Sequence, residues 1–162
     1  MVARIVRGIV AGLLAGIVLG GLLQVMVGFG LGPGPVSMMS LVAHALGTER
    51  LGAAWLGHLA ISAGLGVLFA LLLGRRGEAW DAGTAWGLAY GIAWWIVAAL
   101  VLLPLGLGLP ILAPLRQPAL FPFAVSTLMG SIFFGAIIGS GVAWLSGRAA
   151  PATSARELRR AA

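Results

Sequence analysis

Residues 8–29 read GIVAGLLAGIVLGGLLQVMVGF, and this stretch decides the fold class. Gln24 is its one polar side chain, and no residue in it carries a formal charge. A helix needs about 20 consecutive apolar residues to cross the hydrocarbon core of a bilayer, which is about 30 Å thick. The stretch is long enough, so we expect it to span a membrane as an α-helix.

Three further stretches pass the same test. We expect spans at about 8–29, 53–73, 83–103 and 124–145. The composition agrees, since 60% of the 162 residues are hydrophobic and only 9% are charged, against roughly 25% charged in an ordinary soluble domain. The expected fold is an all-α integral membrane protein, with a four-transmembrane-helix bundle over residues 1–147 and a basic cytoplasmic tail over 148–162.

Arginine is divided unevenly between the two sides of this four-span path. Arg50 and Arg116 fall on one side, and the other eight arginines fall on the side that holds both termini and the short loop at 75–81. Basic residues near helix ends stay on the cytoplasmic side during insertion. We therefore expect both termini to be cytoplasmic. The first apolar run is longer than the roughly 7 to 15 residues of a secretory signal core, so we expect an uncleaved helix there.

Small residues recur at every fourth position in all four spans. Lipid tails are as apolar as leucine, so membrane helices associate by close backbone approach, which small residues at this spacing allow. The spacing predicts one packing face on each helix. The four faces are Gly8, Gly12, Gly16 and Gly20; His58, Ser62, Gly66 and Ala70; Gly83, Gly87 and Gly91; and Thr127, Ser131, Gly135 and Gly139.

An offset of 71 residues aligns the chain with itself without a gap. It matches Gly12, Gly16 and Gly20 with Gly83, Gly87 and Gly91, and it also matches Gly64 with Gly135. This register suggests two helical hairpins related by duplication. Because two spans return the chain to its starting side, the two hairpins would be parallel repeats.

Two loops on the outer side carry further structure. Apolar residues in 37–46 are spaced to form one helical face, which predicts a short helix on the membrane interface. Residues 105–117 are rich in Pro, Gly and Leu. They are too broken to span and too apolar to float in water, so we expect this loop to fold back over the bundle.

Few polar side chains lie within the spans, and each is a candidate for function because buried polarity is costly in lipid. The candidates are Gln24, His58, Ser62, Tyr90, Trp94 and Ser131. One interpretation is that they form hydrogen bonds between helices and fix helix rotation. The alternative is that they line a small cavity, open to the outside, for a ligand or solute.

Signals of catalysis and of metal binding are weak. The four acidic residues, Glu49, Glu78, Asp81 and Glu157, lie in loops and in the tail, and no nucleophile elbow, phosphate loop or zinc motif is present. His44 and His58 are the weak candidates for a metal or haem, with Glu49 as a third ligand, although their spacing matches no metal motif. We expect no enzyme activity, no cofactor and no metal. An intramembrane charge of the kind used in ion-coupled transport is also absent from the spans.

Three segments resemble the YagU-like group of small bacterial inner-membrane proteins. They are AGLLAGIVLGG at 11–21, VSMMSLVAHALG at 36–47 and WLGHLAISAGLG at 55–66. The resemblance implies a bacterial inner-membrane location, and it implies a Gly-His pair near a helix start. Gly57-His58 matches that pair, whereas the last helix has Met129-Gly130 at the corresponding place. The group supplies no activity and no catalytic residues to transfer.

The leading functional hypothesis is an accessory, scaffold or stress-related subunit that is not an enzyme. Its partners would be the lipid bilayer together with other membrane subunits or a second copy of the chain. The net charge of +6 reflects topology and attraction to the inner leaflet, and nucleic-acid binding is not indicated. One alternative is a transporter or channel for a small solute or a lipid-like ligand. A weaker alternative is a haem-binding electron-transfer subunit.

Overall fold

The computed structural model describes residues 1–28, 36–77 and 79–147 as an all-α bundle with four helical spans. Phe29 and the basic tail at 148–162 lie outside the described residues, but the first helix already ends at Val25, short of the expected limit, and Val27–Gly28 is extended. Each described span is long and apolar enough to cross a membrane, and this makes the chain a multi-pass membrane protein. The spans run over Val2–Val25, Leu51–Leu72, Trp80–Gly106 and Pro118–Gly147.

The first two spans are single helices, α1 (Val2–Val25) and α3 (Leu51–Leu72). The third consists of α4 (Trp80–Val97), a π-helical segment η1 (Ala98–Leu102) and α5 (Leu103–Gly106). The fourth is a short 3₁₀ helix η2 (Pro118–Leu120) followed by α7 (Phe121–Gly147). All four reach beyond the expected limits at one end or both, because a helix continues past the apolar core until its backbone groups find water or a cap.

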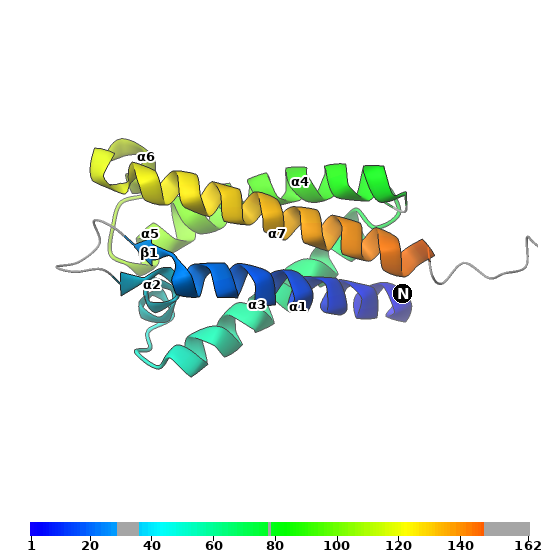
Figure 1. Cartoon of the computed structure of the whole chain (residues 1–162), viewed down its shortest axis with the longest axis horizontal. Coiled ribbons are helices and arrows are strands. Elements are labelled where there is room, and N and C mark those ends of the chain that lie inside the picture. The colour runs from blue at the N-terminus through cyan, green and yellow to red at the C-terminus, as the bar shows by residue number, and fades with distance from the viewer. Residues whose placement is uncertain (29–35, 78, 148–162) are drawn as a thin grey trace, which may run out of the picture.

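Shorter elements gather at one end of the bundle, opposite the N-terminus (Figure 1). They include α2 (Met38–Ala45) and α6 (Ala113–Arg116). Two strands of two residues each, β1 (Val27–Gly28) and β2 (Val36–Ser37), form an antiparallel pair beside α2. We call this end of the molecule the α2 end.

The four predicted glycine faces pair two by two. In the first pair, a Cβ on Gly8 would lie 2.6 Å from the carbonyl oxygen of Gly66, so α1 and α3 touch through their backbones. In the second pair, α4 packs on α7, and a Cβ on Gly83 would lie 2.9 Å from the carbonyl oxygen of Gly139. The bundle therefore consists of two glycine-packed hairpins, α1–α3 and α4–α7, which are joined mainly where α1 packs on α7.

The two hairpins run in the same direction (Figure 1). Gly12, Gly16 and Gly20 of α1 and their predicted equivalents in α4 all face the partner helix of their own hairpin. The match of Gly64 with Gly135 is wrong, because a Cβ on Gly64 would meet no atom within 4 Å, whereas one on Gly135 would overlap the backbone of α4. The second helices are therefore not related by the 71-residue offset.

α2 is the short helix that the apolar spacing predicts, and one side of it is buried against the rest of the protein. Ser37 caps it, since the Ser37 hydroxyl accepts a hydrogen bond of 3.1 Å from the backbone N–H of Ser40. Met38 and Met39 are only 3% and 0% exposed. α2 therefore packs between α1, α3 and α5 instead of resting on the bundle.

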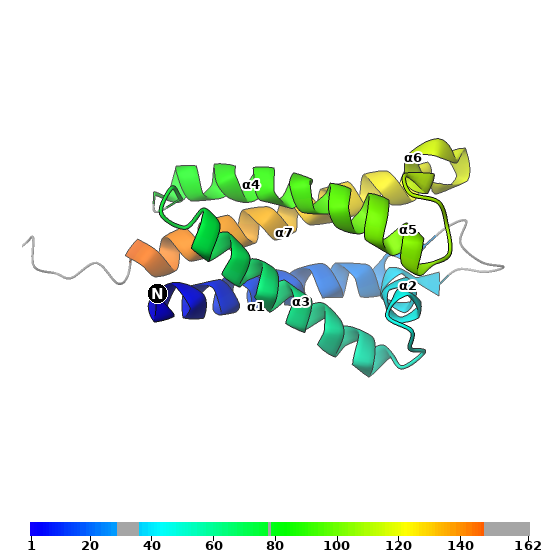
Figure 2. The same cartoon turned by 180° about the vertical axis from the view of Figure 1, so that it is seen from behind.

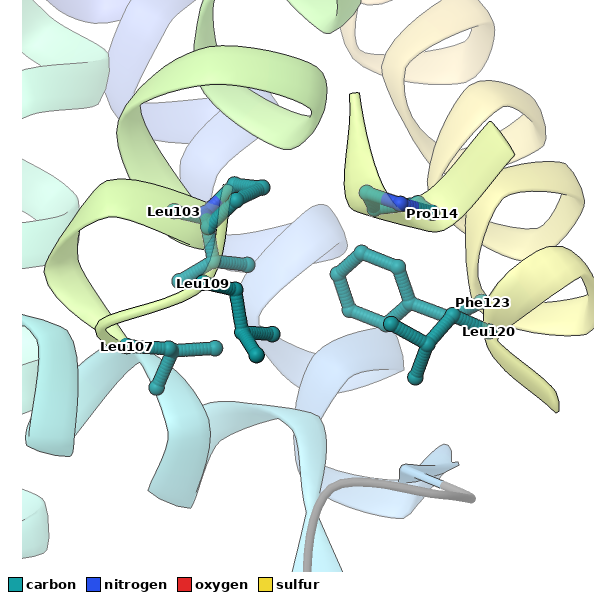
Figure 3. A pocket seen from close by; sticks show the side chains of 7 residues that line it. Leu103, Leu107, Leu109, Pro114, Leu120 and Phe123 are labelled. Carbon is teal, nitrogen blue, oxygen red and sulfur yellow. The ribbon is translucent and has the colours of Figure 1, made fainter. Parts of the chain in front are cut away.

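The loop after α5 folds back over the bundle as expected. Its backbone N–H at Leu112 donates a hydrogen bond of 2.8 Å to the carbonyl oxygen of Leu100 in η1. Figure 3 shows how its apolar side chains gather with those of α5 and α7 around a space of about 10 Å³, too small for more than one water molecule. The loop is therefore a packed cap. The side chains around this space are Leu103, Pro104, Leu107, Leu109, Pro114, Leu120 and Phe123.

Candidate functional site

A cavity of about 300 Å³ lies between α3 and the α4–η1 segment, towards the α2 end. Figure 2 shows that α3 starts far from α5 and approaches α4 only near the loop that joins them. Residues of α1, α2 and α7 line the cavity on its other sides. We call it the α3–α4 cavity, and its volume lies at the lower end of the range for small-molecule sites.

Four of the six predicted polar residues line the α3–α4 cavity. His58 and Ser62 reach it from α3, Trp94 from α4, and Ser131 from α7. His58 and Ser62 lie one turn apart on one face of α3, so both can face the same space. The remaining lining is mostly aliphatic and aromatic, and no charged side chain is among the described residues that line it.

His58 is fixed by a bond to the neighbouring helix. Its Nε2 lies 3.0 Å from the carbonyl oxygen of Gly16, and its ring meets the ring of Trp55 edge-on at a centroid distance of 6.2 Å. The side chain is only 8% exposed. The glycine at position 16 also lets α1 and α3 approach closely, because a Cβ there would lie 2.6 Å from the Cβ and 2.7 Å from the Oγ of Ser62.

Gln24 and Tyr90 serve packing, as the hydrogen-bond interpretation predicts, and they do not line the cavity. The indole N–H of Trp55 donates to Oε1 of Gln24 at 3.2 Å, which joins α1 to α3. The hydroxyl of Tyr90 donates to the carbonyl oxygen of Leu65 at 2.9 Å, which joins α4 to α3. The predicted polar set therefore divides into two groups, one that holds helices together and one that faces open space.

The wall opposite α3 depends on a break in helical register. Pro104 has no N–H to donate to the carbonyl of Leu100, and its ring crowds a regular α-turn. The chain adopts π-helical turns instead, in which the N–H of Leu103 bonds to the carbonyl of Ala98. π-Helical turns inside α-helices are frequent at functional sites. Here Ala98 and Ala99 present only methyl groups to the cavity and so leave it open.

Ser126 and Thr127 of α7 also line the cavity. Neither was among the predicted site residues. Ser126 donates to the carbonyl of Pro122 at 2.8 Å, and Thr127 donates to that of Phe123 at 2.8 Å. Thr127 also accepts a hydrogen bond of 3.1 Å from the indole N–H of Trp95. Their bonds are satisfied within the protein, so they add little polarity. Sequence alone marks Ser126 only as a small hydroxyl in an apolar span, and Thr127 as a member of the predicted packing face of its helix.

The two histidines line different cavities. His44 is exposed on α2 and borders a second cavity of about 230 Å³, together with Glu49, Thr48 and Ser40. Within the described ranges, no three His, Cys, Asp or Glu residues lie close enough to hold a metal ion together. The structure therefore does not bring the two weak metal candidates into one site.

Comparison of the chain with protein-family models, with curated proteins and with solved structures finds no match. We therefore infer the function of the chain from the geometry of the α3–α4 cavity and from the distribution of charge along the chain.

Proposed function

We propose that this chain is a non-enzymatic carrier of a lipid-like molecule in the bacterial inner membrane, and that the molecule is held in the α3–α4 cavity. The observation that supports this proposal is an open cavity of about 300 Å³ whose lining is mostly hydrocarbon. A lipid chain in the bilayer can enter such a site sideways, and close van der Waals packing against the lining would then favour a chain that fits it.

The character of the lining supports a lipid-like ligand over a polar solute or an ion. Small polar solutes are usually bound by several charged or hydrogen-bonding groups, and ion-coupled sites use intramembrane charge. The described lining of the α3–α4 cavity holds no charge, and its polar side chains are few: His58, Ser62, Trp94, Ser126, Thr127 and Ser131. A few polar groups in an otherwise apolar cavity suit an amphiphile with a long chain and a small head.

The rest of the bundle supports a binding protein over a continuous channel. Beyond the cavity, α1, α3 and α7 meet in a cluster of buried apolar side chains that includes Ala11, Phe69 and Ile138, each 0% exposed. A water-filled path would have to pass through this cluster. Close packing of this kind excludes water, so the cavity is expected to end there.

The position of charged residues supports the inner membrane with both termini in the cytoplasm. Arg4 and Arg7 lie on the first turns of α1, and Arg75 and Arg76 lie in the connection between α3 and α4, at the same end of the bundle. The similarity to the YagU-like group points to the same membrane. With this orientation, the α2 end and the cavity lie in the outer half of the bilayer.

An accessory or scaffold role in a larger complex has less support. The glycine faces that would favour docking on another membrane helix are used inside the chain, in the α1–α3 and α4–α7 hairpins. A haem-binding role would need His44 and His58 at one site, and they border separate cavities. Co-purification tests the first of these roles, and the visible spectrum of the pure protein tests the second.

Native mass spectrometry tests the proposal directly. The protein is purified in mild detergent, and its mass is recorded at increasing collision energy, which removes loosely bound lipids first. A carrier predicts one lipid that stays bound at energies that strip the others. A chain that leaves the detergent with no retained lipid, or with a random set of lipids, would contradict the proposal.

A further inference from the structure

The orientation of the His58 ring determines which hydrogen-bonding group it offers to the cavity. The carbonyl oxygen of Gly16, 3.0 Å from Nε2, can only accept a hydrogen bond, so Nε2 must carry a proton and donate. In neutral imidazole the other nitrogen then has a free lone pair. Nδ1 of His58 is therefore a hydrogen-bond acceptor.

That acceptor is not satisfied by the protein. Across residues 1–28, 36–77 and 79–147, no hydrogen bond joins Nδ1 of His58 or the hydroxyls of Ser62 and Ser131 to another residue. Yet the same part of the chain contains no fully enclosed side-chain nitrogen or oxygen that lacks a partner. These three polar atoms must therefore meet open space, and the space that their side chains line is the α3–α4 cavity.

Because these side chains are buried, they restrict which head group a bound ligand can carry. His58 and Ser62 are only 8% and 1% exposed, so bulk water cannot satisfy them freely. A buried acceptor without a donor is costly, and a ligand that supplies the donor removes that cost. The ligand's head should therefore carry an O–H or N–H group to donate to Nδ1, and oxygen lone pairs to accept from the serine hydroxyls.

The head should also be uncharged. No charged side chain is among the described residues that line the cavity. A phosphate or carboxylate would therefore lose its hydration without gaining a cation, and its oxygen atoms would face the lone pair of Nδ1. An ammonium head would likewise find no carboxylate.

We propose that the ligand held in the α3–α4 cavity is a neutral lipid with a hydroxyl head, such as a long-chain alcohol or a diacylglycerol. This inference rests on the proposed function and specifies its ligand. The head's hydroxyl donates to Nδ1 of His58, and its oxygen can accept from a donor in the lining, such as the Ser131 hydroxyl or the Trp94 indole N–H. A volume of about 300 Å³ holds roughly ten heavy-atom groups, the head included, if each takes about the share of a water molecule, about 30 Å³. The rest of the chain extends between α3 and η1 into lipid.

Photo-crosslinking in lipid nanodiscs tests the choice of head. Three probes share one chain with a photoactivatable diazirine and differ only in the head: a primary alcohol, its methyl ether and the corresponding carboxylic acid. The ether lacks the O–H donor, and the acid is charged. We expect the alcohol to label the peptides that line the cavity about fivefold more than either of the others, which is the effect of about one hydrogen bond.

Variants at the two histidines provide the matched controls. His58→Phe keeps an aromatic ring without the acceptor, so the alcohol should lose its preference over the ether. His58→Gln can still donate to Gly16 and accept from a ligand, so it should retain the preference. His44→Phe changes a histidine outside this cavity and should behave as the wild type.

The outcomes separate this inference from the proposed function. Equal labelling of the cavity by all three probes in the wild type would overturn the hydroxyl head and leave lipid binding intact. Stronger labelling by the acid would also overturn it. Labelling of the cavity by none of the probes would contradict the proposed function and this inference together. The wild-type comparison decides the matter even if His58→Phe does not fold.

Discussion

The backbone N–H of Leu112 donates a hydrogen bond of 2.8 Å to the carbonyl oxygen of Leu100. Pro104 would otherwise leave this carbonyl without its usual partner four residues along the helix, inside a membrane where unpaired backbone groups are costly. The returning loop thus completes the hydrogen bonding of η1, and η1 forms one wall of the α3–α4 cavity. The cap at the α2 end and the cavity are parts of one arrangement.

Restoring the missing N–H should disturb this arrangement. In Pro104→Ala, the new N–H can bond to Leu100, so a regular α-turn competes with the π turn and the N–H of Leu112 loses its acceptor. Hydrogen exchange followed by mass spectrometry should show faster exchange in the peptide that contains Leu112. Pro118→Ala is the control, because Pro118 begins η2, where an N–H has no partner within the helix. Equal exchange in both variants would contradict the role given to Pro104.

Gly87 lies where the backbones of α4 and α7 touch, and it should not tolerate a side chain. A Cβ at Gly87 would overlap the backbone of Gly135, which cannot move aside as a flexible side chain could. We expect Gly87→Ala to lower the free energy of unfolding by about 1–3 kcal/mol, as measured by SDS-induced unfolding in detergent. Gly64→Ala is the matched control, since its Cβ would meet no atom within 4 Å. Similar losses for both variants would argue against packing through the glycine faces.

The bond between Trp55 and Gln24 should make a small contribution. Hydrogen bonds between membrane helices average about 0.6 kcal/mol and reach about 1.7 kcal/mol. Trp55→Phe and Gln24→Leu should each destabilise the bundle, and the double variant should lose less than the sum of the two. The coupling from this double-mutant cycle is the measured quantity. Strict additivity would mean that the 3.2 Å contact contributes nothing to stability.

The chain contains no cysteine, so single cysteines can report its orientation without background. Ala79 lies at the end of the bundle with the N-terminus, and Ala119 lies at the α2 end; both are exposed. In intact cells with a permeable outer membrane, a thiol reagent that cannot cross the inner membrane should label Ala119→Cys. It should label Ala79→Cys only after lysis. The reverse pattern would place the cavity in the inner half of the bilayer.

Sequence alone predicts the helices and much of how they associate. Hydropathy locates four spans because the bilayer imposes a minimum apolar length. The four-residue spacing of Gly8 to Gly20 and of Gly83 to Gly91 identifies the packing faces, because only small residues permit backbone contact. It does not identify which faces meet. That depends on loop lengths and on the register of the second helices, where the 71-residue match of Gly64 with Gly135 is wrong.

The site is less predictable than the fold. Polarity in an apolar span singles out His58, Ser62 and Ser131, and these do face one cavity. The same criterion also singles out Gln24 and Tyr90, which bond to neighbouring helices, because a pattern does not reveal where a side chain finds its partner. No sequence pattern marks the cavity itself. It exists where Ala98 and Ala99 fail to fill space beside a π-helical turn, and small apolar residues are common throughout this chain.

The central claim is that the α3–α4 cavity holds a lipid, and filling the cavity tests it most directly. Ala98→Phe would place a phenyl ring in the cavity, whereas Ala93→Phe adds the same ring at an exposed position of the same span that does not line it. Native mass spectrometry should detect a retained lipid on the wild type and on Ala93→Phe, and none on Ala98→Phe. Equal retention by the two variants would contradict the claim.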